Sequence, residues 1–344
     1  MPDITCRIEG RAGRITLNRA KALNALTWDM CLEIEKALAA WADDPAVNLI
    51  IIDGLPCEKA FCAGGDLAEM YATGTAGDYS YGRRFWQDEY RMNAALFNFP
   101  KPVVTFLHGF VMGGGVGVGC HGSHRIVCDD SRIAMPETKV GLVPDVGGSL
   151  ILARAPGRLG EYLGVTSARM GPGDAIHAGF ADYYIPRDHW AALIDTLVET
   201  GDWDAVDRSA LPAPDSKIAS QKADIDWLFG GETLRDIVNL LQVTDSDFAR
   251  GALRAMDENS PISMACAVEL IHRSRQKDTI EGALDLEYRF TARSMEKGDF
   301  LEGIRALIID KDNAPRWRHA GPGAVPPAEV SAMFRPLGAD ALTL

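Results

Sequence analysis

Short apolar runs alternate with segments of helical spacing over the first 190 or so residues of the chain. Residues 4–9 and 13–18 predict two strands around a glycine turn, and residues 47–52 and 102–108 predict buried strands. Between them, the spacing from Thr27 to about Asp43 predicts a helix with Thr27 as its N-cap. This alternation predicts an α/β fold in which helical crossovers link the strands.

The pattern changes near residues 209–216, a segment rich in proline, alanine and serine. Strand signals almost vanish beyond it, and four further helices are predicted at residues 233–242, 245–256, 263–275 and 279–296. We therefore expect a core over residues 1–208 and a mainly helical C-terminal region over residues 209–344. Within the core, residues 66–99 read as a polar helical stretch that ends at Pro100.

Charge and composition narrow the class of partner. The chain has 344 residues, and its formal net charge is 35 − 48 = −13. An acidic protein repels nucleic acid and anionic membrane surfaces, so we expect neither as a partner. The seven cysteines are an odd number without a Cys-x-x-Cys pair, which is typical of free thiols in a reducing compartment. No leader and no long apolar run are recognised, so we expect a cytoplasmic protein.

The strongest chemical signal is the segment 134–148, in which two carboxylates, Glu137 and Asp145, stand among apolar residues, prolines and glycines. Burial raises the pKa of a carboxyl group and suits it to act as an acid, base or nucleophile. The alternative is structural: Glu137 caps a helix and Asp145 begins a turn. Upstream, glycine turns follow two predicted strands, at residues 60–67 and 109–119. Two backbone N–H groups and one buried carboxylate are what acyl chemistry requires.

These segments resemble the crotonase (enoyl-CoA hydratase/isomerase) superfamily, and within it the 3-hydroxyisobutyryl-CoA hydrolase subgroup, from about residue 4 to about residue 320. The motifs that carry the resemblance are Asn18–Leu26, Phe61–Asp66, Glu89–Arg91, Met112–Gly117, Met135–Thr138, Pro144–Gly148, Asp299–Leu307, Asp310–Asp312 and Pro315–Trp317. The resemblance implies a spiral of ββα units. Ala20 stands where the family often has proline, which leaves that loop less rigid.

The resemblance also implies roles for individual residues. Gly114 and Gly65 would be the first and second oxyanion donors. Glu137 would either attack the thioester carbonyl, forming an anhydride, or activate water. Asp145 would face the 3-hydroxyl of the substrate. Further contacts with an acyl-CoA substrate are expected at Glu89, Arg19, Lys21 and Ala63; the alternative for Glu89, Arg19 and Lys21 is that they are ordinary solvated charges.

Gly117 separates the two leading functions. Hydratases of the superfamily carry a second catalytic glutamate at this place, and this chain has no side chain there. Because adding water to a double bond needs a second acid–base group, the glycine favours hydrolysis. The resemblance thus implies hydrolysis of 3-hydroxyisobutyryl-CoA in valine breakdown, with no metal or redox cofactor, and it is compatible with a homo-oligomer. The alternatives are an enoyl-CoA hydratase or isomerase and a non-catalytic acyl-CoA-binding subunit.

Three other features are weaker. A Gly-x-Gly-x-x-Gly match at residues 117–122 falls inside a predicted helix rather than directly after a strand, so it is a poor dinucleotide site. The group Cys120, His121, His124 and Cys128 fits no common zinc spacing. We expect His108, before the second glycine turn, to be a packed residue rather than a catalytic base.

Overall fold

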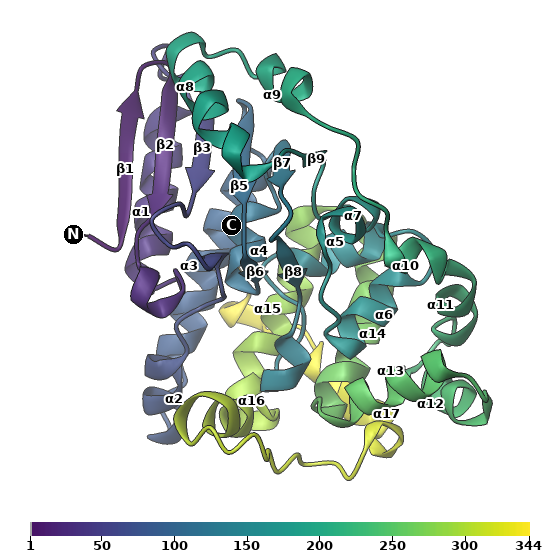
Figure 1. The fold of residues 1–344 in the computed structure, drawn as a ribbon. Helices are drawn as coiled ribbons and strands as arrows, with labels where there is room; N and C mark the ends of the chain where they lie inside the picture. The colour runs from purple at the N-terminus through teal and green to yellow at the C-terminus, as the bar shows by residue number, and fades with distance from the viewer. Residues whose placement is uncertain (1) are drawn as a thin grey trace. The chain divides into compact units, whose positions relative to one another are not determined.

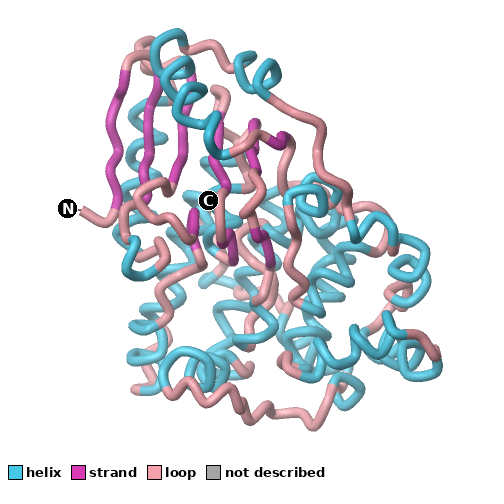
Figure 2. The backbone as a smooth tube through the Cα atoms, in the orientation of Figure 1, coloured by secondary structure: helices cyan, strands magenta, loops and turns pink. Residues whose placement is uncertain are grey.

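A computed structural model describes residues 2–344, which fall into two compact units that are interleaved along the chain. The first unit comprises residues 1–65, 91–134 and 169–219, and the second comprises residues 66–90, 135–168 and 220–344. The units do not follow the boundary expected at residue 208, because residues 66–90 and 135–168 pack with the C-terminal helices. All strands of the described chain belong to the first unit (Figure 2).

The strands of the first unit form two sheets (Figure 1). The larger sheet has the order β1-β2-β3-β5-β7-β9 and the smaller has the order β4-β6-β8. Their bounds are β1 Ile4–Glu9, β2 Ala12–Leu17, β3 Leu49–Asp53, β4 Ala60–Cys62, β5 Val103–Leu107, β6 Phe110–Met112, β7 His124–Val127, β8 Arg132–Ala134 and β9 Tyr183–Tyr184. Only β1 and β2 pair antiparallel, as the predicted hairpin; the remaining neighbours are parallel.

The topology repeats a short unit of two strands and a helical segment. In the pairs β3/β4, β5/β6 and β7/β8, the first strand joins the larger sheet and the second joins the smaller one. The carboxyl ends of the parallel strands β4 and β6 therefore lie next to each other, and each runs into a glycine loop. The predicted α/β class with helical crossovers is confirmed. The three-residue strand β6 was not predicted, because the sequence reads directly as a glycine turn there.

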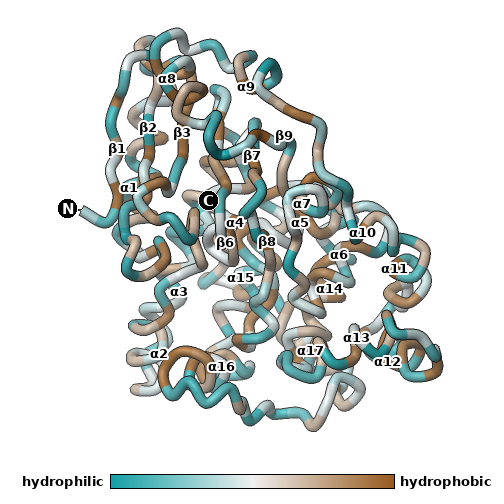
Figure 3. The backbone as a smooth tube through the Cα atoms, viewed as in Figure 1, coloured by the Kyte–Doolittle hydropathy of each residue, from teal (hydrophilic) through white to brown (hydrophobic). Residues whose placement is uncertain are grey.

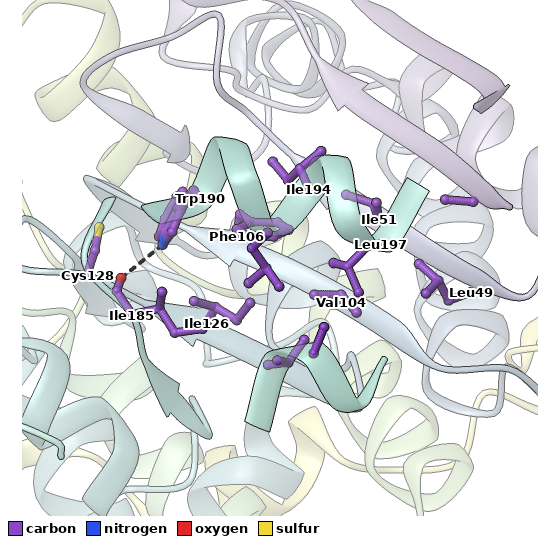
Figure 4. Packing of buried hydrophobic residues seen from close by; sticks show 14 residues of the cluster. Leu49, Ile51, Val104, Phe106, Ile126, Cys128, Ile185, Trp190, Ile194 and Leu197 are labelled. Carbon is purple, nitrogen blue, oxygen red and sulfur yellow. Dashed lines mark hydrogen bonds between the residues drawn. The ribbon is translucent and has the colours of Figure 1, made fainter. Parts of the chain in front are cut away.

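Apolar burial holds helix α8 (Trp190–Thr200) against the larger sheet (Figure 4). β3 is buried along its length, and its residues before Asp53 are hydrophobic (Figure 3), as expected of a parallel strand that is covered on both faces. Trp190 packs edge-on against Phe106 of β5, and its indole N–H donates to the carbonyl of Ile185 at 2.9 Å. The other helical segments of this unit are η1 Ala20–Ala22, α1 Trp28–Trp41, α4 Gly114–Gly119, α7 Pro172–His177, η3 Arg187–His189 and α9 Asp204–Ser209.

The second unit is helical. Its segments are α2 Ala68–Thr75, the first part of α3 Ser80–Phe97, η2 Glu137–Val140, α5 Gly148–Arg154, α6 Leu159–Thr166, α11 Lys222–Leu228, α12 Leu234–Val243, α13 Asp247–Asp257, α14 Pro261–Lys277, α15 Ile280–Lys297, α16 Phe300–Ile304, the π-helical turn η4 Arg305–Ile309, η5 Pro322–Ala324, α17 Pro327–Met333 and η6 Gly338–Asp340. The short α10 (Lys217–Ser220) lies where the two units meet in sequence.

The N-cap predicted at Thr27 is confirmed, and three further helices begin with caps of the same kind. Thr27, Thr233, Ser260 and Thr279 each accept a hydrogen bond from the backbone of the first helical turn. The expected helical stretch 66–99 is instead two helices, α2 and α3, because the chain turns at Gly77, whose φ is +84°. Across residues 2–344, no helix combines the length and the apolar character needed to cross a membrane.

Candidate active site

Two glycine loops meet in the first unit, after β4 and β6. A Cβ atom at Gly115 would lie only 2.2 Å from the carbonyl oxygen of Cys62, so the loops approach too closely for any side chain at this position. Gly113 precedes α4 with a φ of +53°, which L-residues rarely adopt. Glycine is therefore required here to bring the two loops together.

The two expected donors lie on these loops. Gly114 is the first residue of α4, so its N–H has no acceptor within the helix. Gly65 forms a parallel bridge with Leu26, and among residues 2–344 no hydrogen-bond acceptor is found for its N–H. Two such N–H groups on touching loops can bind an oxyanion. Ala63 lies on the same loop as Gly65, and its N–H donates to the carbonyl of Leu23 at 3.0 Å.

The segment Asn18–Leu26 is tied to the first glycine loop by its buried Asn24. The side-chain amide of Asn24 donates to the carbonyl of Phe61 at 3.0 Å, and the N–H of Leu26 donates to the carbonyl of Gly64 at 2.8 Å. The two expected cations of this segment differ. Arg19 contacts Asp3 at 3.4 Å and the carbonyl of Ala25 at 3.1 Å, which makes it partly structural. Lys21 is exposed and remains the better candidate for an anionic ligand.

Glu137 lies in the second unit, as the first residue of η2. Its side chain is only 5% exposed, and neither carboxyl oxygen has a hydrogen-bond partner on another residue among residues 2–344. Burial, and then the charge of Asp145, raise the pKa of Glu137 well above its ordinary range. A buried polar group without a partner is rare in proteins and costly to maintain. Its presence here points to a functional group rather than to the helix cap considered from the sequence.

Asp145 lies between η2 and α5 and is also buried. The hydroxyl of Tyr90, on α3, donates to its Oδ2 atom at 2.7 Å. Burial raises the pKa of Asp145 to about 7, although the bond from Tyr90 opposes this shift. Val146, the next residue, has a φ of +53°, which is strained for a β-branched side chain. Strained backbone of this kind is concentrated at functional sites.

Two more buried carboxyl groups complete the set. Glu89, adjacent to Tyr90 on α3, has its pKa raised well above the ordinary range by burial and by the charges of Asp145 and Glu287. Glu287 comes from α15, and burial raises its pKa to about 8. We refer to Glu89, Glu137, Asp145 and Glu287 as the carboxyl cluster.

Glu287 holds the turn that carries Asp145. Its carboxylate accepts hydrogen bonds from the N–H of Gly147 at 2.8 Å, from the N–H of Ser149 at 3.2 Å and from the Ser149 hydroxyl. These donors belong to the N-terminus of α5, where negative charge is favourable. The strained Asp145–Gly147 turn is thus fixed from its backbone by Glu287 and from its side chain by Tyr90.

The C-terminal motif Asp299–Leu307 supports the turn that carries Glu137. A Cβ atom at Gly303, on α16, would lie 2.1 Å from the carbonyl oxygen of Val140, the last residue of η2. From the same side, the N–H of Ser260 donates to the carbonyl of Thr138 at 2.8 Å, and the Ser260 hydroxyl donates to Asp299 at 2.7 Å. The motif is therefore explained by packing against η2.

The structure brings Glu89, Glu137 and Asp145 together in the second unit and Ala63, Gly65 and Gly114 together in the first. Tyr90 and Glu287 were not predicted as residues of the site. Tyr90 lies inside a matched motif and could have been considered for that reason, whereas Glu287 is 140 positions from Gly147 and no local signal marks it.

The weaker sequence features take ordinary positions. His108 is buried beside β5, with Nε2 at 2.6 Å from the carbonyl oxygen of Cys57, and burial lowers its pKa. Much of the Gly-x-Gly-x-x-Gly match at residues 117–122 lies in α4, as expected, and not directly after a strand. Within residues 2–344, no group of three or more His, Cys, Asp or Glu side chains is arranged to hold a metal ion.

Comparison with known proteins agrees with this arrangement. The sequence profile described as Enoyl-CoA hydratase/isomerase matches residues 12–334, so the chain belongs to the enoyl-CoA hydratase/isomerase family, the crotonase superfamily. Within it, the chain groups with the proteins named 3-hydroxyisobutyryl-CoA hydrolase, mitochondrial. Those of Gallus gallus and Homo sapiens are each 35% identical to it, and the alignments cover 99% of this chain and 91% and 90% of theirs.

Solved structures confirm the crotonase-like fold. An enoyl-CoA hydratase from Rhodobacter sphaeroides 2.4.1 superposes with a TM-score of 0.94 at 52% identity, covering all of both chains. A carnitinyl-CoA dehydratase from Mycobacterium thermoresistibile gives a TM-score of 0.94 at 39% identity, covering 100% of this chain and 99% of that one. The similar proteins therefore carry names from two reaction types, hydrolysis and hydration or dehydration.

Proposed function

We propose that this protein hydrolyses a short-chain 3-hydroxyacyl-CoA thioester, with 3-hydroxyisobutyryl-CoA as its substrate and 3-hydroxyisobutyrate and CoA as its products, a step of valine breakdown. The observation that carries the proposal is the buried Glu137, whose carboxyl group has no partner and lies in one cluster with Asp145. The names of the relatives that align over nearly the whole chain support the same reaction.

Glu137 acts on the thioester carbonyl in one of two ways. As a nucleophile, its carboxylate forms an anhydride and expels the CoA thiolate, and water then cleaves the anhydride. As a base, it takes a proton from a water molecule that attacks the carbonyl carbon directly. In both cases a negative charge develops on the carbonyl oxygen, and the N–H groups of Gly65 and Gly114 stabilise it, each contributing roughly 3–4 kcal/mol. The released thiolate takes up a proton and leaves as CoA.

Asp145 recognises the substrate's 3-hydroxyl group. The Tyr90 hydroxyl binds Oδ2, so Oδ1 is left to accept a hydrogen bond from the substrate. Tyr90 and Glu287 are positioning residues in this scheme, because they act on Asp145 and its turn. Lys21 and Arg19 supply positive charge for the CoA phosphates. This local charge is needed because the acidic chain as a whole repels these anionic groups.

The names of the two solved structures favour a second candidate, enoyl-CoA hydration or dehydration. This reaction uses the same oxyanion donors, because an enolate develops on the thioester oxygen. It also needs a positioned water and a proton for the α-carbon. Gly117 is buried within α4 and offers no side chain for the second of these tasks. Glu137 alone can serve only one of them, so we assign hydrolysis.

The test is a set of CoA thioesters assayed for the appearance of free thiol. The proposal predicts that 3-hydroxyisobutyryl-CoA gives the highest kcat/KM, ahead of isobutyryl-CoA and crotonyl-CoA. Absence of thiol release from every member of the set would refute the assignment as a hydrolase.

A further inference from the structure

The hydrogen bonds that Asp145 and Glu287 of the carboxyl cluster accept come from neutral groups. Tyr90 is the donor to Asp145, and Glu287 receives its hydrogen bonds from two backbone N–H groups and a serine hydroxyl. Within residues 2–344, none of the four carboxyl groups forms an ion pair with lysine, arginine or histidine. By contrast, the buried Glu161 of the same unit contacts Arg158, Arg275 and His272.

The unsatisfied Glu137 points to a ligand at the cluster. It is nine-tenths buried and both of its oxygens lack partners on other residues. Structural carboxyl groups in this chain are satisfied, as Glu161 and Glu287 demonstrate. The unsatisfied member is the one that the proposed reaction places against the acyl carbonyl.

From this arrangement we infer that the site selects the acyl group by charge. It accepts neutral acyl groups that can donate a hydrogen bond, and it rejects acyl groups that carry a carboxylate. The inference rests on the proposed function, because it assumes that the acyl group lies against the carboxyl cluster.

The physical reason is that no lysine, arginine or histidine of residues 2–344 pairs with the cluster, so the cluster itself brings no cation to an arriving carboxylate. Burying an unpaired carboxylate is costly even beside neutral neighbours, and beside ionised ones the like charges repel as well. Specificity of this kind acts against the wrong ligand rather than in favour of the right one. A hydroxyl group, in contrast, donates to a carboxylate without adding charge.

Shape alone would not provide this discrimination. Methylmalonyl-CoA differs from 3-hydroxyisobutyryl-CoA only in carrying a carboxylate where the latter has a hydroxymethyl group. A pocket separates ligands of such similar size weakly when size is the sole criterion. The two thioesters therefore form a nearly isosteric pair that differs mainly in charge.

The experiment measures thiol release from three thioesters: 3-hydroxyisobutyryl-CoA, isobutyryl-CoA and methylmalonyl-CoA. Methylmalonyl-CoA and 3-hydroxyisobutyryl-CoA are nearly isosteric and differ mainly in the charge of the acyl group. The acyl group of isobutyryl-CoA is neutral and lacks the hydroxyl, so comparing it with methylmalonyl-CoA keeps the hydrogen bond of the 3-hydroxyl out of the difference. We expect kcat/KM for methylmalonyl-CoA to be lower than for isobutyryl-CoA by at least about a hundredfold. Rates for these two within threefold of each other would overturn the inference while leaving hydrolysis of 3-hydroxyisobutyryl-CoA intact. No thiol release from any of the three would instead refute the proposed function.

A substitution in the carboxyl cluster tests whether the cluster causes the selection by charge. Asp145→Asn removes one ionisable carboxyl group of the cluster. It should reduce the ratio of kcat/KM for isobutyryl-CoA to kcat/KM for methylmalonyl-CoA by at least about tenfold. Asp195→Asn is the control: it removes an exposed charge from α8 and should leave this ratio of kcat/KM values unchanged. An unchanged ratio in Asp145→Asn would contradict selection by the carboxyl cluster.

Inhibition of the wild-type enzyme by methylmalonyl-CoA provides a measurement that needs no variant. The inhibition constant of methylmalonyl-CoA should greatly exceed that of isobutyryl-CoA, and equal constants would contradict the inference.

Discussion

At the scale of single residues, the buried carboxyl groups differ in whether they accept hydrogen bonds from other residues. Glu287 and Asp145 receive hydrogen bonds, and Glu137 receives none from another residue within the described chain. Such a group lowers stability, because its desolvation is not compensated. It is retained, in our account, because the reaction uses it.

Glu137→Gln should reduce thiol release by at least about a thousandfold while folding and binding of the CoA ester are largely preserved. The amide has the same shape but neither attacks a carbonyl nor takes a proton. The measurements are kcat, the Kd of a CoA ester and a thermal melt. Turnover within tenfold of the wild type would exclude Glu137 as the central residue.

Asp145→Asn should impair 3-hydroxyisobutyryl-CoA more than isobutyryl-CoA. Losing a charged acceptor for the 3-hydroxyl group should cost about 1.5–3 kcal/mol of transition-state binding for the hydroxylated substrate alone. The comparison is between the two values of kcat/KM in variant and wild type. Equal losses on both thioesters would remove Asp145 from recognition of the hydroxyl.

The burial of Glu137 and Asp145 was predictable because they stand in a short, otherwise apolar segment. Tyr90 and Glu287 were not assigned, because their roles depend on contacts between distant segments. Glu287 reads in the sequence as one more charge on an amphipathic helix, α15. The geometry that makes it a positioning residue exists only once α15 packs against the N-terminus of α5.

At the scale of elements, the N-cap at Thr27 and the buried strands β3 and β5 were predicted, because both depend on local sequence. The break between α2 and α3 and the short strand β6 were missed, because the first depends on one glycine conformation and the second on pairing with β4 and β8. The motif around Gly303 was recognised by its resemblance to the family. The structure explains it physically, because Gly303 packs against η2.

Gly303→Ala should destabilise the protein by roughly 1–3 kcal/mol and lower kcat, because the added methyl group would displace the turn that carries Glu137. Gly323→Ala is the matched control, since a Cβ atom there meets no atom within 4 Å. Thermal melts and thiol release report the two effects. If both variants behaved like the wild type, η2 would not depend on α16.

At the scale of the whole molecule, a chain with a net charge of −13 also buries a cluster of carboxyl groups. Burial raises the pKa of Asp145 from 3.8 to about 7 in the folded protein, so the folded state binds this proton more tightly than the unfolded state does. The resulting stabilisation is fully present below the unfolded pKa near 4 and is lost as the pH rises through about 7.

The wild-type protein should therefore lose stability between about pH 4 and pH 7, with Asp145 contributing on the order of 4 kcal/mol across its full titration. The titratable groups that face Asp145 come from α3, η2 and α15: Glu89, Tyr90, Glu137 and Glu287. Asp145→Asn keeps these groups and should make the pH dependence of stability less steep. The measurement is Tm against pH for Asp145→Asn, with Asp195→Asn as control. Parallel curves for wild type and Asp145→Asn would show that the Asp145 proton is not bound more tightly in the folded state.

A paired assay distinguishes hydrolysis of a thioester by this member of the family from hydration of a double bond. On a single enzyme stock, thiol release from 3-hydroxyisobutyryl-CoA is measured beside the loss of enoyl absorbance from crotonyl-CoA. Because nothing at Gly117 can act as the second acid–base group, hydrolysis should exceed hydration by at least about a hundredfold. Fast hydration of crotonyl-CoA with no release of thiol would contradict the account.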